Sequence, residues 1–158
     1  MKDKLTQIEI DQRVAVLKRF KTLLQEQRKK FNDYLVVLET QERSIAEENI
    51  DAILHHTKLE QSIIGDIFTI QKVIDPIEKM YEFSQPCNDG NEVIKLKNDL
   101  DKLQNQVLIQ NKKNRELLKS RMTDIREEII SISPIHTNIP AAVFAKETVT
   151  SSLVDISI

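Results

Sequence analysis

The stretch Ile10–Ile45, IDQRVAVLKRFKTLLQEQRKKFNDYLVVLETQERSI, decides the fold of this chain. An apolar residue recurs at every seventh position along it, and neither glycine nor proline interrupts it. A strict seven-residue repeat has the period of a long helix packed in a left-handed bundle or coiled coil. We therefore expect one helix over about residues 9–46. The repeating residues are Ile10, Leu17, Leu24, Phe31, Leu38 and Ile45.

The positions halfway between these apolar residues are mixed in character. A two-stranded rod needs a second apolar line at these positions, because both lines face the partner helix. The mixture therefore favours a bundle of several helices over a fibrous rod. The intervening residues are Val14, Lys21, Arg28, Leu35 and Glu42.

A second helix is expected over about residues 49–83. Asn49 is a favourable N-cap residue, because its side chain can accept a hydrogen bond from the first turn. Pro76 predicts a break or a kink, since proline has no backbone donor and disfavours helix at the residue before it. Apolar residues spaced by three and four fill one face of this segment.

A third helix is expected over about residues 92–132, after a loop that contains Pro86 and Gly90. From residue 133 to residue 158 the helical period is lost, and we interpret this segment as a flexible tail. The predicted fold is all-α, an elongated antiparallel three-helix bundle or coiled coil. Residues 1–132 would form one helical domain, followed by the tail.

Composition argues against catalysis. The chain has 158 residues, but only two glycines and one cysteine, so phosphate-cradling loops, intramolecular disulfides and multi-cysteine metal sites are not expected. We predict no enzyme activity, no cofactor and no metal. The net charge of −2 offers no general attraction for nucleic acid. With no segment like a signal peptide or a membrane span, we expect a cytoplasmic protein without membrane insertion.

Charge is distributed unevenly along the chain. Residues 1–30 carry a net charge of +5, residues 31–92 of −9, and residues 93–132 of +3. One interpretation is complementary packing of an acidic middle helix between two basic ones. The other is an acidic docking surface for a partner.

The predicted third helix has a polar interruption at Asn111 and Asn114, between two apolar stretches. An asparagine in an apolar seam can fix the register of the helices. It can also mark the place where the helix leaves the bundle and offers its apolar face to a partner. The two interpretations are compatible.

Several segments resemble the FlgN-type flagellar export chaperones, and in particular their spirochaete branch. The most distinctive is the N-x-x-N-x-x-L-L step at residues 111–118, and the resemblance covers roughly residues 15–130. The matching stretches are ETQER (39–43), EENIDAI (47–53), HTKLE (56–60), LEQSII (59–64), IQKVIDP (70–76) and NKKNRELL (111–118).

The resemblance implies a cytoplasmic chaperone of the type III flagellar export system. Such a protein binds the C-terminal segments of hook–filament junction proteins, of the FlgK and FlgL types, and delivers them to the export apparatus. We expect an apolar groove to accept the client helix, with tail residues contacting it when it is empty. The predicted client-binding residues are Asn111, Asn114, Leu117, Leu118, Met122, Ile125 and Ile129, and the predicted tail contacts are Phe144, Leu153 and Val154.

Two other classes of protein remain open at this stage. The first is a structural coiled-coil protein that acts by homo-oligomerisation, in the simplest case as a homodimer joined through the heptad line of the first helix. The second is a helical protein that binds nucleic acid through its basic ends. Weak non-specific binding of that kind would fall steeply with added salt.

Overall fold

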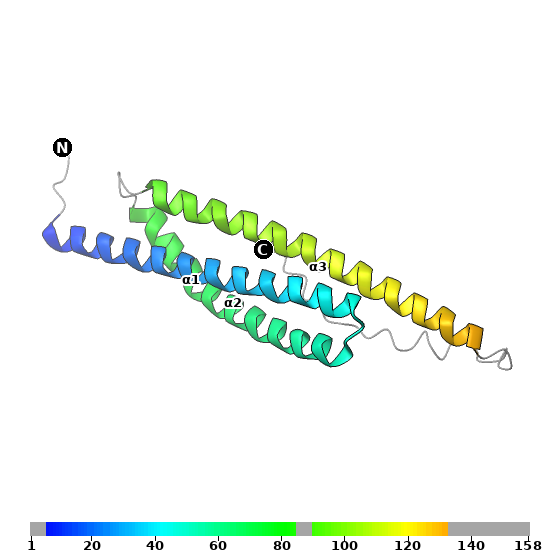
Figure 1. Ribbon diagram of the computed structural model, residues 1–158. Coiled ribbons are helices and arrows are strands. Elements are labelled where there is room, and N and C mark those ends of the chain that lie inside the picture. Colours follow the sequence, from blue (N-terminus) through cyan, green and yellow to red (C-terminus); the bar gives the residue numbers. More distant parts are fainter. Residues whose placement is uncertain (1–5, 85–89, 133–158) are drawn as a thin grey trace. The chain divides into compact units, whose positions relative to one another are not determined.

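The computed structural model describes residues 6–84 and 90–132, and within them the chain forms three helices and no strand (Figure 1). The predicted all-α three-helix bundle is thereby confirmed. The segment expected to be a flexible tail, residues 133–158, lies outside the described residues. By the contacts among its residues the chain divides between Arg121 and Met122, and the described residues on the two sides of this boundary belong to separate units. The helices are α1 (Gln7–Ala46), α2 (Ile50–Ser84) and α3 (Gly90–Ile132).

Both α1 and α2 begin at capping side chains. The Thr6 Oγ1 accepts a hydrogen bond from the Glu9 amide (3.4 Å), and the Glu9 carboxylate accepts one from the Thr6 amide (2.7 Å). This reciprocal pair is a capping box, and it starts α1 two residues before the predicted position. Asn49 Oδ1 accepts from the Ala52 amide (3.1 Å), which confirms Asn49 as the N-cap of α2.

The turn between α1 and α2 places a glutamate where glycine is usual. Glu48 has φ 55°, in the left-handed region. The Asn49 amide donates to the Ser44 carbonyl (2.9 Å) and the Glu48 amide to the Ile45 carbonyl (3.1 Å). These two bonds form a Schellman motif, in which the left-handed residue is normally glycine because a Cβ is strained there.

Replacing this glutamate, Glu48→Gly, is expected to raise the free energy of unfolding by about 0.5 kcal/mol, the relief of strain exceeding the entropy cost of glycine. Urea denaturation followed by circular dichroism measures the change. The matched control is Glu47→Gly, because Glu47 has right-handed geometry (φ −85°). The control should lower stability, and a loss of stability in both variants would contradict the explanation.

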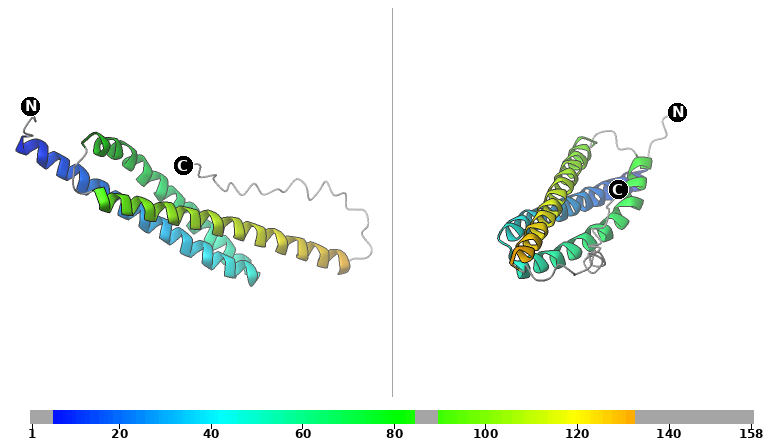
Figure 2. Two further views of the ribbon diagram at one scale, coloured as in Figure 1. Left: turned by 90° about the horizontal axis from the view of Figure 1, so that it is seen from above. Right: turned by 90° about the vertical axis from the view of Figure 1, so that its right-hand side faces the viewer.

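The expected break at Pro76 is not seen, because α2 is continuous from Ile50 to Ser84. Proline removes one helical hydrogen bond, but Ile74 is buried in the core and Ile77 packs against it, so residues on both sides of Pro76 are held. Figure 2 shows that α2 is curved, and proline is a frequent cause of bending. Tertiary packing thus maintains a helix that the local sequence disfavours.

The apolar repeat of α1 lies in the core, as predicted, except at its first position. Ile10 is 40% exposed, whereas the five later members of the repeat are buried. Next to this line, Phe20 of α1 packs on Tyr81 in the last turns of α2, with the two ring centroids 4.9 Å apart. The buried members of the repeat are Leu17, Leu24, Phe31, Leu38 and Ile45.

Lys21, Arg28 and Glu42, the charged residues halfway between the apolar repeat of α1, form ion pairs with α3. This pairing explains why these positions are not apolar. Each pair joins residues 71 positions apart, so within residues 1–121 the two helices run in the same direction in one register. Contacts between α1 and α2 run the opposite way, for example from Gln27 to Gln71 (3.2 Å) and from Gln41 to Glu60 (3.4 Å). The pairs between α1 and α3 are Lys21–Glu92 (2.6 Å), Arg28–Asp99 (3.3 Å) and Glu42–Lys113 (2.7 Å).

The acidic second helix also pairs with both of its neighbours. Lys30 of α1 contacts Asp66 of α2 (2.7 Å), and Lys97 of α3 contacts Glu78 of α2. These pairs agree with the interpretation of the charge pattern as complementary packing. Each is partly exposed and contributes only about 0–1 kcal/mol, so together they define register and orientation more than stability.

Candidate partner-binding surface

The core-facing line of α3 continues as an apolar line far beyond its buried part. Upstream, Val93, Leu100 and Val107 are buried against the other helices of the unit 1–121. With 3.6 residues per turn, five later apolar residues fall on the same side of this continuous helix. We call these five residues the α3 stripe. They are Leu118, Met122, Ile125, Ile129 and Ile132.

Every residue of the α3 stripe is exposed. The exposed fraction is 38% at Leu118, the last member within residues 1–121, and lies between 42% and 79% at the four members within residues 122–132. Leu117, also predicted to bind a client, is half-buried. Burying a leucine, isoleucine or methionine fully contributes about 1.5–3 kcal/mol. A run of such residues is therefore a strong candidate for contact with a partner.

Asn114 lies inside the bundle, where it attaches α3 to α1. Its side chain is 3% exposed, and its Nδ2 donates to the Leu38 carbonyl (2.7 Å) and to Gln41 Oε1 (3.0 Å). Its Oδ1 accepts from Gln110 Nε2 (2.9 Å). These bonds agree with the interpretation of Asn114 as a residue that fixes the register of the helices. All three partners of its side-chain amide belong to the bundle.

Asn111 contributes more weakly to the same junction. It is half-buried, and its Nδ2 lies 3.4 Å from the hydroxyl of Tyr34 on α1. The two asparagines therefore mark the last polar layer of the bundle before the α3 stripe begins. Their predicted contact with a client remains a prediction.

The substitution Asn114→Ala is expected to lower the free energy of unfolding by about 1–2 kcal/mol, because Gln41 and the Leu38 carbonyl lose a buried donor. Thermal or urea denaturation measures the loss. The control Lys112→Ala changes an exposed residue of the same helix, and should stay within about 0.5 kcal/mol of the parent protein. Equal stability of the two variants would show that the buried amide contributes nothing.

Glu60 is a buried carboxylate in the same polar layer. It is 8% exposed, its Oε2 accepts from Gln41 Nε2 (3.4 Å), and its Oε1 has no hydrogen-bond partner among the described residues. Burial raises the pKa of Glu60 to about 6, although the bond from Gln41 and the charge of Arg115 act in the opposite direction. Burial, with the nearby Glu60 charge, also raises the pKa of Tyr34.

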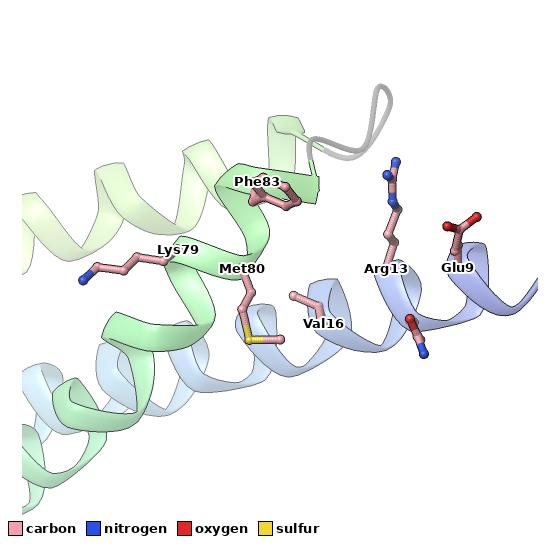
Figure 3. A pocket seen from close by; sticks show the side chains of 7 residues that line it. Glu9, Arg13, Val16, Lys79, Met80 and Phe83 are labelled. Carbon is pink, nitrogen blue, oxygen red and sulfur yellow. The ribbon is translucent and has the colours of Figure 1, made fainter. Parts of the chain in front are cut away.

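A hollow in the unit 1–121 lies between the first turns of α1 and the last turns of α2 (Figure 3). Its volume is about 420 Å³. Figure 3 shows Val16 of α1 close to Met80 of α2, with Phe83 one turn further along α2. Phe83 is 94% exposed. The sequence did not single out this groove, because its two sides come from segments about 70 residues apart. Its lining residues are Glu9, Gln12, Arg13, Val16, Lys79, Met80 and Phe83.

The described residues offer no cluster for a metal ion. Nowhere in residues 6–84 and 90–132 do three or more histidine, cysteine, aspartate or glutamate side chains gather as a possible metal site. His56 is half-buried, and its Nδ1 lies 3.4 Å from Ser44 Oγ, while the neighbouring His55 is exposed. In the same part of the chain, no helix has the length and apolar character needed to cross a membrane.

Comparison with known proteins places the chain beside a protein of unknown function. Over 121 residues it is 41% identical to an uncharacterized protein of Treponema pallidum (strain Nichols), and this region covers 77% of each chain. No protein-family model matches the sequence. No solved structure matches it either. The tail residues predicted to contact the groove, Phe144, Leu153 and Val154, lie outside the described residues.

Proposed function

We propose that this chain, which belongs to the same family as the Treponema pallidum protein, is a cytoplasmic chaperone of the flagellar type III export system. Its clients would be the C-terminal segments of hook–filament junction proteins of the FlgK and FlgL types. The proposal is supported by the resemblance of residues 15–130 to FlgN-type chaperones. It is also supported by the α3 stripe, a run of exposed apolar residues on the third helix.

The α3 stripe is the observation that carries the proposal. An amphipathic client helix laid against it would bury the apolar residues of both partners, in the helix-in-groove mode of recognition. A client segment covered in this way cannot self-associate through the same residues. The chaperone would act by binding alone, without catalysis or a cofactor, and would release its client at the export apparatus.

Isothermal titration of the full chain with the C-terminal segments of the junction proteins from the same genome tests the proposal. We expect saturable binding with a Kd of about 1 μM or lower, equivalent to about −8 kcal/mol. Scrambled segments of the same composition, which lack the amphipathic pattern, are the control and should not bind. No binding by a chain that circular dichroism shows to be folded would contradict the proposal.

A structural homo-oligomer is the second candidate, and the exposed start of the α1 repeat favours it. Ile10 and Val14 continue the apolar side of α1 and are 40% and 44% exposed. A second copy could cover them, as in a coiled coil. Light scattering over a dilution series distinguishes the candidates. A dimer that persists on dilution and does not bind junction segments would favour the structural role.

A further inference from the structure

The two edges of the α3 stripe differ in charge. One edge carries only cations, Arg115, Lys119 and Arg126, which lie about 60–100° around the helix from the centre of the stripe. We call these three residues the basic ridge. The opposite edge is mixed and carries Arg121, Asp124 and Glu128.

No acidic residue interrupts the basic ridge. Between Lys112 and Ile132, the remaining acidic residues, Glu116 and Glu127, fall on the side of α3 opposite the stripe. The register of one continuous helix determines these positions. The three charged positions along this edge of the stripe are therefore all basic.

We propose that the α3 stripe selects an amphipathic client helix whose apolar face is bordered by acidic side chains. The inference rests on the proposed function and adds the chemistry of its partner. A helix that lies along the stripe brings one of its own edges against the basic ridge, because side chains that flank two packed apolar faces meet across the contact. Acidic side chains there form ion pairs with the ridge, whereas basic ones are repelled.

The size of this preference follows from the number of pairs. Each partly exposed pair contributes about 0.2–1 kcal/mol, so three pairs predict a preference of about tenfold between acidic and basic clients. Because exposed charges are screened by salt, the preference should shrink between about 0.02 M and 0.5 M NaCl. Apolar burial should change little over the same range.

The test uses two synthetic helical peptides with the same leucine face. Both edges of that face carry glutamate in one peptide and lysine in the other. Titration into the full chain at low salt should give about tenfold tighter binding of the glutamate peptide. Equal affinities, or a preference for the lysine peptide, would overturn the inference while leaving the stripe as a binding surface. Binding of neither peptide would overturn both the inference and the stripe as the client site.

Charge reversal on the protein completes the test. The double variant Lys119→Glu/Arg126→Glu should reverse the preference between the two peptides. Arg115 is left unchanged, because its charge acts on the buried Glu60. The control Lys102→Glu reverses an exposed charge on the other side of α3, and should bind both peptides as the parent protein does. An unchanged preference in the double variant would overturn the basic ridge as its source.

Discussion

The double variant Ile125→Asp/Ile129→Asp is expected to bind junction-protein segments at least ~100-fold more weakly than the parent chain. Burying the exposed parts of the two isoleucines contributes about 1.5–3 kcal/mol to such a contact, and each aspartate adds the cost of placing a charge in an apolar interface. Both residues are exposed in the free protein, at 42% and 60%. The folded state should therefore tolerate the change, and circular dichroism should remain helical.

A matched control separates the stripe from apolar surface in general. Ile94 and Ile109 are 57% and 70% exposed on the same helix, but they lie away from the stripe and from the basic ridge. The variant Ile94→Asp/Ile109→Asp makes the same chemical change and should bind clients as the parent does. Titration calorimetry compares the two double variants directly. Equal weakening in both, or none in either, would mean that the α3 stripe is not the client site.

The groove between α1 and α2 provides a further comparison. If that surface holds the client, then Phe83→Asp should weaken binding, because Phe83 is the most exposed residue of its apolar lining. We expect this variant to bind as the parent chain does. A loss of affinity at Phe83, with the stripe variant unaffected, would move the client site to the groove of Figure 3.

The variant Glu60→Gln is expected to gain about 2 kcal/mol of stability relative to the parent protein between pH 4.5 and pH 7. The pKa of Glu60 is about 6 in the folded protein, against a usual value of 4.5. The folded state therefore opposes ionisation, and a difference of about 1.5 units corresponds to about 2 kcal/mol. Glutamine keeps an acceptor for Gln41 and removes the buried charge.

The dependence on pH has a defined sign. Above the folded pKa of about 6, Glu60 is charged in both the folded and the unfolded chain, and the full cost of burying the charge is present. As the pH falls from about 6 to 4.5, the folded protein takes up a proton before the unfolded chain does, so the cost is lost. The stability that the variant gains over the parent through the lost charge should therefore be largest at pH 7, and it should disappear below pH 4.5.

Urea denaturation of both proteins at several pH values measures this gain in stability, and the other carboxylates cancel in the difference. The exposed Glu116, changed to glutamine, is the control, and should stay within about 0.5 kcal/mol of the parent protein at pH 7. If the gain for Glu60→Gln stays constant from pH 7 to pH 4.5, the added stability does not come from ionisation of Glu60. If the variant instead loses stability relative to the parent as the pH rises from 4.5 to 7, the charged carboxylate is favoured in the bundle.

The sequence by itself determined the helices and most of their ends. Periodicity is a local property, so Ile10–Ile45 predicted α1 to within two residues, and Asn49 was correctly assigned as a cap because its bond to Ala52 lies within one turn. The capping box at Thr6 was equally local and was overlooked. Pro76 was misjudged, because local propensity disfavours the helix there and the packing of α2 maintains it.

Only the tertiary structure determined which residues of different helices contact each other. The pairing of α1 with α3 at a separation of 71 positions depends on how three helices share one core, and no local pattern encodes that number. Within residues 1–121 the same pairing buries Asn114 against Leu38, and the packing of α1 against α2 brings Gln41 to the buried Glu60. The sequence could show that these side chains lie on an apolar or polar face of a helix. Whether a face is covered depends on contacts between segments far apart in the chain, and those form only in the folded protein.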